Sequence, residues 1–94
     1  MISRQLDLFE REQVDVISEC EELERAYNAA PRDEAEERYG DYVDAVEAGT
    51  ELLADLRDYF AMTLEDEASE EYEDAFNRAV AKRLPRFGLE IENR

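Results

Sequence analysis

The chain has 94 residues, of which 27 are acidic, 11 are basic and 44% are hydrophobic, and its formal net charge is −16. Its length allows one domain with a thin core, because folding a chain of this size removes roughly 60–68% of its surface from water. The hydrophobic fraction is too high for a simply disordered chain. The absence of histidine and the single cysteine exclude histidine-based catalysis, structural zinc sites and internal disulfides.

The first predicted element is a long helix over residues 3–29. Its apolar positions follow a 4,3 spacing, which keeps one stripe of a helix facing a partner helix. The stripe contains Ile2, Leu6, Phe9, Gln13, Val16, Cys20, Leu23, Tyr27 and Ala30. Ser3 can cap the start of this helix. Cys20 is expected to be a small buried hydrophobe on the stripe.

A second long helix is predicted over residues 32–64, after Pro31, which suits a first turn. Its stripe contains Ala35, Tyr39, Tyr42, Val46, Gly49, Leu53, Leu56, Phe60 and Thr63, and its margin contains Val43, Leu52 and Tyr59. Since the stripe keeps its phase across Gly40, we expect a continuous or merely bent helix there. The alternative is that Gly40 ends one short helix and Asp41 caps another. Gly49 lies on the stripe, where a missing side chain permits close helix approach.

The last third of the chain begins with an acidic segment, residues 65–74, which has seven acids and is expected to hold the least structure by itself. Ser69 offers a cap for a third helix over residues 70–84, and Pro85 stops this helix. The tail, residues 85–94, alternates weakly between apolar and polar positions and is consistent with an extended segment.

These elements predict an all-α fold in a single domain over residues 1–94. Short connections make the two long helices an antiparallel hairpin about 40–50 Å long, which the third helix is too short to cover. We therefore expect a three-helix bundle that pairs, in a coiled-coil manner, into a homodimer with a four-helix core. The predicted self-association seam contains Leu6, Phe9, Gln13, Val16, Leu53, Leu56 and Phe60.

The charged residues are unusual in kind as well as in number, because ten of the 11 bases are Arg and only Lys82 is lysine. Self-repulsion at −16 destabilises a compact chain unless salt screens it, and at about 1 M salt the Debye length is only about 3 Å. This composition resembles that of the small acidic helical proteins of halophilic archaea. The resemblance is compositional, covers the whole chain and implies a cytoplasm rich in potassium. An ordinary acidic protein is the alternative interpretation.

The N-terminal sequence begins Met1-Ile2-Ser3-Arg4 and continues with charged residues. No stretch longer than six residues lacks a charge, so the sequence predicts neither a signal peptide nor a membrane span. A lone cysteine fits a reducing compartment. The expected location is the cytoplasm.

Two groups of charged residues are candidate sites. The acidic clusters lack the turn glycine and converging ligands of a calcium loop, so we expect them to attract hydrated cations diffusely, with no metal or cofactor site. The segment 75–89 has four bases and no acid; the bases are Arg78, Lys82, Arg83 and Arg86. They complement the dipole at a helix C-terminus and can dock on the acidic hairpin, or they can form a partner-binding patch.

The leading functional hypothesis is a non-enzymatic interaction or scaffolding protein that self-associates and can bind a protein partner. The rival is a nucleic-acid-linked module that contacts phosphates through segment 78–86 or imitates a phosphate backbone with its acidic faces. The rest of the surface would repel nucleic acid. A carboxylate-metal enzyme is the third hypothesis, since carboxylates alone can hold oxygen-preferring metals.

Overall fold

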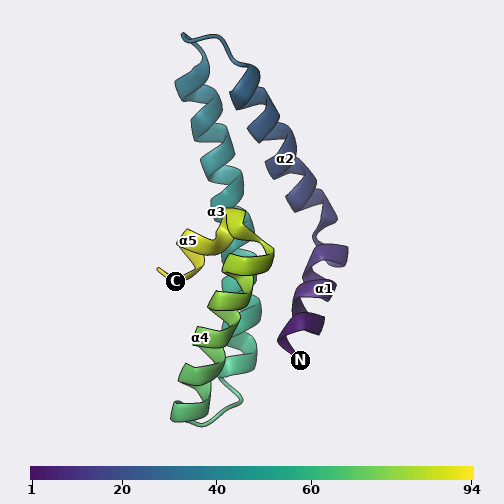
Figure 1. Ribbon diagram of the computed structural model, residues 1–94, viewed down its shortest axis with the longest axis vertical. Coiled ribbons are helices and arrows are strands. Elements are labelled where there is room, and N and C mark those ends of the chain that lie inside the picture. Colours follow the sequence, from purple (N-terminus) through teal and green to yellow (C-terminus); the bar gives the residue numbers. More distant parts are fainter.

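The computed structural model describes residues 1–94 and is all-helical, as predicted for the fold class (Figure 1). The number and bounds of the helices differ from the prediction of three. The elements are α1 (Ile2–Glu12), α2 (Val14–Ala29), α3 (Ala35–Ala61), α4 (Asp66–Arg83), a 3₁₀ turn η1 (Pro85–Phe87) and α5 (Gly88–Ile91). The molecule is elongated and measures 51 × 24 × 19 Å.

The longest helix, α3, runs through most of the molecule, and its two halves have different neighbours (Figure 1). Its first half packs against α2, and these two helices form one end of the molecule. Its second half packs against α4, which also contacts α1. The turn η1 and α5 fold back across the middle of α3. The core therefore lies near the middle and the α4 end, where four elements meet.

The predicted first helix is broken at Gln13, whose backbone angles are φ −111° and ψ 31°. The three β-branched residues that follow, Val14, Val16 and Ile17, lower the local helix propensity. The break changes the direction of the chain, so that α1 packs on α4 rather than continuing along α3. Phe9 thereby meets Phe87 edge-on, with ring centroids 6.4 Å apart. Core packing on both sides of Gln13 decides the geometry there.

The second helix is continuous through Gly40, as predicted. It spans Ala35–Ala61 and is therefore shorter at both ends than the predicted range 32–64. Gly40 is exposed, and no atom outside its own helix lies within 4 Å of the position that a Cβ would take. Gly49 was predicted to permit a close helix approach. The group that comes closest is the ring of Phe87 from η1, since a Cβ at Gly49 would lie 2.6 Å from Phe87 Cε1.

The acidic segment 65–74, which was expected to hold the least structure by itself, is helical from Asp66 onward in the folded chain. Helix α4 begins at Asp66 without a side-chain cap, and Ser69 lies within its first turns. Asp66 and Glu67 are stabilised by the positive end of the helix dipole. Tyr72 is buried and packs on Phe60, with ring centroids 4.8 Å apart. Dipole and tertiary packing together overcome the charge repulsion.

The tail is folded rather than extended. Phe87 and Ile91 are fully buried, and a Cβ at Gly88 would lie 3.0 Å from the Ala81 backbone. The predicted helix 70–84 accordingly ends at Arg83, where Pro85 starts η1 and turns the chain back onto α3. The weak alternation does not describe this segment, because Phe87 and Ile91 are buried whereas Leu89 between them is 83% exposed.

Candidate functional site

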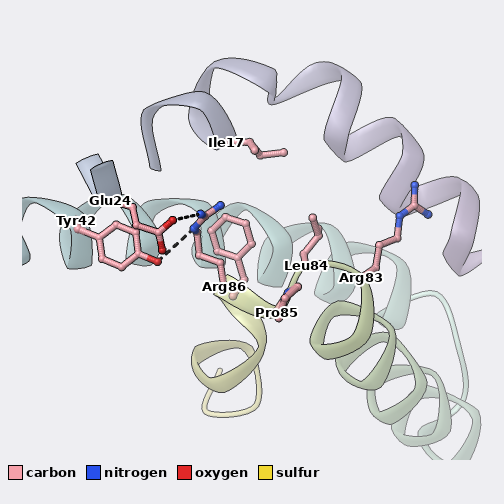
Figure 2. A pocket seen from close by; sticks show the side chains of 8 residues that line it. Ile17, Glu24, Tyr42, Arg83, Leu84, Pro85 and Arg86 are labelled. Carbon is pink, nitrogen blue, oxygen red and sulfur yellow. Dashed lines mark hydrogen bonds and ion pairs between the residues drawn. The ribbon is translucent and has the colours of Figure 1, made fainter. Parts of the chain in front are cut away.

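A hollow of about 450 Å³ lies where η1 meets α2 and α3, and Figure 2 shows its walls. Its lining combines apolar side chains with two guanidinium groups. The lining residues are Ile17, Glu24, Tyr42, Arg83, Leu84, Pro85, Arg86 and Phe87. Two of the four bases singled out in the sequence therefore belong to the lining of this hollow.

Arg86 ties η1 to both long helices of the hairpin (Figure 2). Its Nε donates to the Tyr42 hydroxyl at 3.2 Å, and its Nη2 donates to Glu24 Oε1 at 3.0 Å. Burial opposes the charge on Arg86, but the hydrogen bonds and charges of Tyr42 and Glu24 outweigh it and raise the pKa of the guanidinium. The cation of Arg86 is thus used within the chain.

Arg83 is similarly engaged, at the C-terminal end of α4. Its Nη1 donates to the Ser3 carbonyl at 3.2 Å, and its Nη2 donates to Glu10 Oε2 at 2.8 Å and also to Asp7. The hydrogen bonds to Asp7 and Glu10 raise the pKa of this exposed guanidinium. They link α4 to α1, so segment 78–86 docks on acids of the chain itself at two of its four bases.

The other two bases, Arg78 and Lys82, are exposed one turn apart on α4 and form no ion pair within 4.0 Å. Arg83 reaches α1, whereas Arg86 reaches α2 and α3. The four bases are therefore divided between two internal anchors and one small exposed pair. Binding of nucleic acid or of a partner by this segment stays a prediction.

The predicted self-association seam lies largely inside the single chain. Leu6, Phe9 and Leu53 are buried. The remaining four positions, Gln13, Val16, Leu56 and Phe60, are half-buried. The 4,3 spacing brings together residues that pack within one chain, and self-association stays a prediction.

A second stripe with the same spacing lies on the opposite side of α3, and we call it the outer face. It consists of Ala48, Leu52, Asp55 and Tyr59 of α3 and of Met62 directly after this helix, all of them exposed. The exposed fractions are 75% for Tyr59 and 77% for Met62. In sequence, Leu52 and Tyr59 only widened the inner stripe. Their 4,3 register with Ala48 and Met62 is the signal that identifies a separate face.

Sequence reasoning also missed Arg57, which is 3% exposed in the middle of the core. Its Nη1 donates to the Ile91 carbonyl at 3.1 Å and to Asn77 Oδ1 at 3.0 Å, while its Nε donates to Asp58 Oδ1 at 2.8 Å. Arg57 therefore holds α5 and α4 against α3. The available signal was its place four residues after Leu53, among the apolar positions of the stripe.

Other reactive groups do not converge. Cys20 is free and fully buried, and burial raises the pKa of its thiol. The acidic and cysteine side chains form no group of three or more arranged to hold a metal ion. Every helix is either too short or too polar to cross a membrane.

Comparison with known proteins found no relative of this chain. No family model matches it, and no curated protein or solved structure is significantly similar to it. The geometry of its own surfaces is therefore the basis for a functional assignment.

Proposed function

We propose that this protein is a non-enzymatic helical interaction protein that pairs with a second copy of itself in concentrated salt through the outer face of α3. The observation that carries the proposal is this unpartnered face. Leu52, Tyr59 and Met62 share it with Ala48, and only Asp55 interrupts its apolar character. Exposed apolar residues gathered on one face of a helix support an interaction role for that face.

The charge of the chain sets the conditions for pairing. Two chains of −16 repel each other strongly in dilute buffer, whereas the screening length is about 3 Å at 1 M salt and shorter still at about 2 M. The apolar contribution to association persists in such a solvent. A salt-rich, reducing cytoplasm fits both the acidic, arginine-rich surface and the single buried thiol.

The size of the face indicates reversible pairing. Residues 48–62 cover about 21 Å of helix, and a helix with its side chains is about 10–12 Å wide. The resulting footprint is well below the roughly 800 Å² per partner of a standard stable interface. We therefore expect a monomer–dimer equilibrium that depends on protein concentration rather than a permanent dimer.

The test is light scattering after size exclusion in about 2 M KCl over a range of protein concentrations. The mass of the wild type should rise from 11.0 kDa toward twice that value. A double variant, Leu52→Glu with Tyr59→Glu, should stay monomeric, because it places four acids across the paired faces. Its helicity, measured by circular dichroism, should be unchanged, since both side chains are exposed.

The matched control is the double variant Val14→Glu with Leu89→Glu. It adds the same two acids at exposed apolar positions on α2 and α5. This control should dimerise as the wild type does in 2 M KCl. A wild type that stays at 11.0 kDa at the highest concentration would refute the proposal, as would equal loss of pairing in both double variants.

A further inference from the structure

We infer that the groove between α1 and α4 binds an acidic amphipathic helix of a protein partner. The groove contains a hollow of about 620 Å³, and both helices contribute to its lining. The lining residues are Ile2, Ser3 and Leu6 of α1 and Ala79, Lys82 and Arg83 of α4. This surface is separate from the outer face of α3, so the inference does not depend on self-association.

The first feature that selects the partner is the charge around the groove. Residues 1–11 form most of α1, and residues 75–89 form the second half of α4 and the turn after it. Together these two segments carry six of the 11 bases but only two of the 27 acids. Both of these acids, Asp7 and Glu10, are bound to Arg83. Because α1 packs on α4, the fold creates a basic region beside the hollow on an otherwise strongly acidic molecule.

Two bases beside the hollow are available to a ligand. Lys82 lines the hollow, and Arg78 lies one turn before it on α4. Both side chains are exposed, and neither forms an ion pair within 4.0 Å. Two acids one turn apart on a partner helix would match this spacing. Since exposed ion pairs contribute little by themselves, the apolar part of the groove must contribute to affinity as well.

The second feature is the apolar character of the groove between the two helices. Ile2 and Ala79 are only half-buried, and so is Ala75, one turn before Ala79. Small side chains on α4 allow a further helix to approach closely, because the distance between packed helices depends on the side chains at the contact. Amphipathic helices bind such grooves through apolar side chains spaced one turn apart. An apolar groove with a basic edge therefore fits a helix whose acids lie beside its apolar stripe.

The same two features argue against a nucleic acid as the ligand. Affinity for a phosphate backbone comes from many basic contacts, of order 6–10 in a protein that binds DNA strongly, whereas two free bases lie beside this hollow. The 25 acids outside the two segments repel a polyanion. A short acidic helix carries fewer charges, and its apolar side chains gain from leaving water. The observations therefore favour a protein segment.

Fluorescence anisotropy with a labelled synthetic peptide tests the inference. The probe is a helical peptide of about 15 residues, about 22 Å long, with leucines at 4,3 spacing and flanking glutamates. It should bind the wild type in about 0.5 M KCl, where salt screens long-range repulsion but direct ion pairs still contribute. The double variant Arg78→Glu with Lys82→Glu should weaken binding about tenfold, because it replaces two attractions by two repulsions.

Folding of this variant is checked by circular dichroism, and its helicity should equal that of the wild type because both side chains are exposed. A neutral double variant, Arg78→Gln with Lys82→Gln, removes the two attractions without adding acids to the end of α4. It should weaken binding by a smaller factor, about threefold. The pair of variants thus measures the contribution of the two bases even if the charge reversal perturbs α4.

The matched control is the double variant Arg25→Glu with Arg32→Glu. It makes the same change of net charge as the reversal, at exposed bases on α2 and in the loop after it. This control should bind the peptide as the wild type does. The double variant Leu52→Glu with Tyr59→Glu should also bind it, because the outer face is not part of the groove. Failure of self-association would therefore leave peptide binding intact.

Four outcomes would overturn the inference. The first is no binding of the peptide to the wild type at concentrations up to about 1 mM. The second is equal weakening by the two charge-reversed double variants, which would mean that only net charge matters. The third is equally tight binding of a single-stranded oligonucleotide, or of a peptide with glutamines in place of the leucines. The fourth is loss of dimers from Arg78→Glu with Lys82→Glu in light scattering, which would place a second copy in the groove.

Discussion

The inner and outer faces of α3 carry similar residues but have opposite environments. Leu53 on the inner face is fully buried, whereas its neighbour Leu52 on the outer face is 37% exposed. Each face also includes one charged residue, the buried Arg57 on the inner face and the exposed Asp55 on the outer face. The apolar pattern alone therefore does not decide which face of this helix becomes the core.

The difference between the faces lies in what the rest of the chain supplies. On the inner side, Gly49 leaves room for the ring of Phe87, and Arg57 binds the Ile91 carbonyl at 3.1 Å. Thr50 satisfies its own hydroxyl by donating to the Val46 carbonyl at 2.7 Å. On the outer side, Leu52, Tyr59 and Met62 remain exposed.

The largest expected difference between the faces is in the cost of removing a leucine. Leu53→Ala should lower the free energy of unfolding by about 3 kcal/mol, because it leaves a cavity in a closed core. Leu52→Ala should lower it by less than about 1 kcal/mol. Urea denaturation of dilute protein in 2 M KCl measures both values for the monomer. Equal losses would mean that the outer face is packed in the monomer.

A smaller difference is expected between two glycines of the same helix. Gly49→Ala should destabilise the chain by about 1–2 kcal/mol, because its Cβ would overlap the Phe87 ring, even though Ala is the better helix former. Gly40→Ala is the matched control and should stabilise the chain by up to about 1 kcal/mol, since its site is open. Thermal unfolding of the two variants measures both signs. A stabilising Gly49→Ala would show that the ring of Phe87 moves freely.

The smallest expected effect concerns the contribution of the buried Cys20 thiol to stability at high pH. Burial raises the pKa of Cys20 above its ordinary value of 9.0, so the unfolded chain loses this proton first. The contribution of Cys20 to the free energy of unfolding is therefore fully present below pH 9.0. It is lost as the pH rises through the pKa of the thiol in the folded chain. Cys20→Ala removes this contribution and should lose less stability between pH 8 and 10 in urea titrations. Identical losses in both chains would show that the thiol is not shielded from water.

Several features of the fold follow from local pattern and were predicted correctly. The all-helical class, the continuity of α3 through Gly40 and the burial of Cys20 depend on the spacing of apolar residues along a helix. The break at Gln13 and the folded tail could not be predicted in this way. Both depend on Phe87, which packs on Phe9 and Gly49 from far along the chain.

The candidate sites show the same division. The sequence identified Arg83 and Arg86 as a basic segment and included docking on the chain's own acids as one of two interpretations. Only the tertiary structure brings Arg83 to Glu10 and Arg86 to Glu24, 73 and 62 residues away in the chain. The outer face was visible in the sequence only as a margin, because two apolar stripes on one helix merge in a linear pattern.

The sequence by itself determined the helical class, the continuity of the helix through Gly40 and a net charge of −16, because these properties depend on spacing and composition. The tertiary structure decided which apolar stripe is buried, where the first helix breaks and how the tail closes the core. Those outcomes depend on shape complementarity between distant residues, such as Phe87 and Gly49, and on the burial of Arg57 against the Ile91 carbonyl. Neither relationship is encoded in a local repeat.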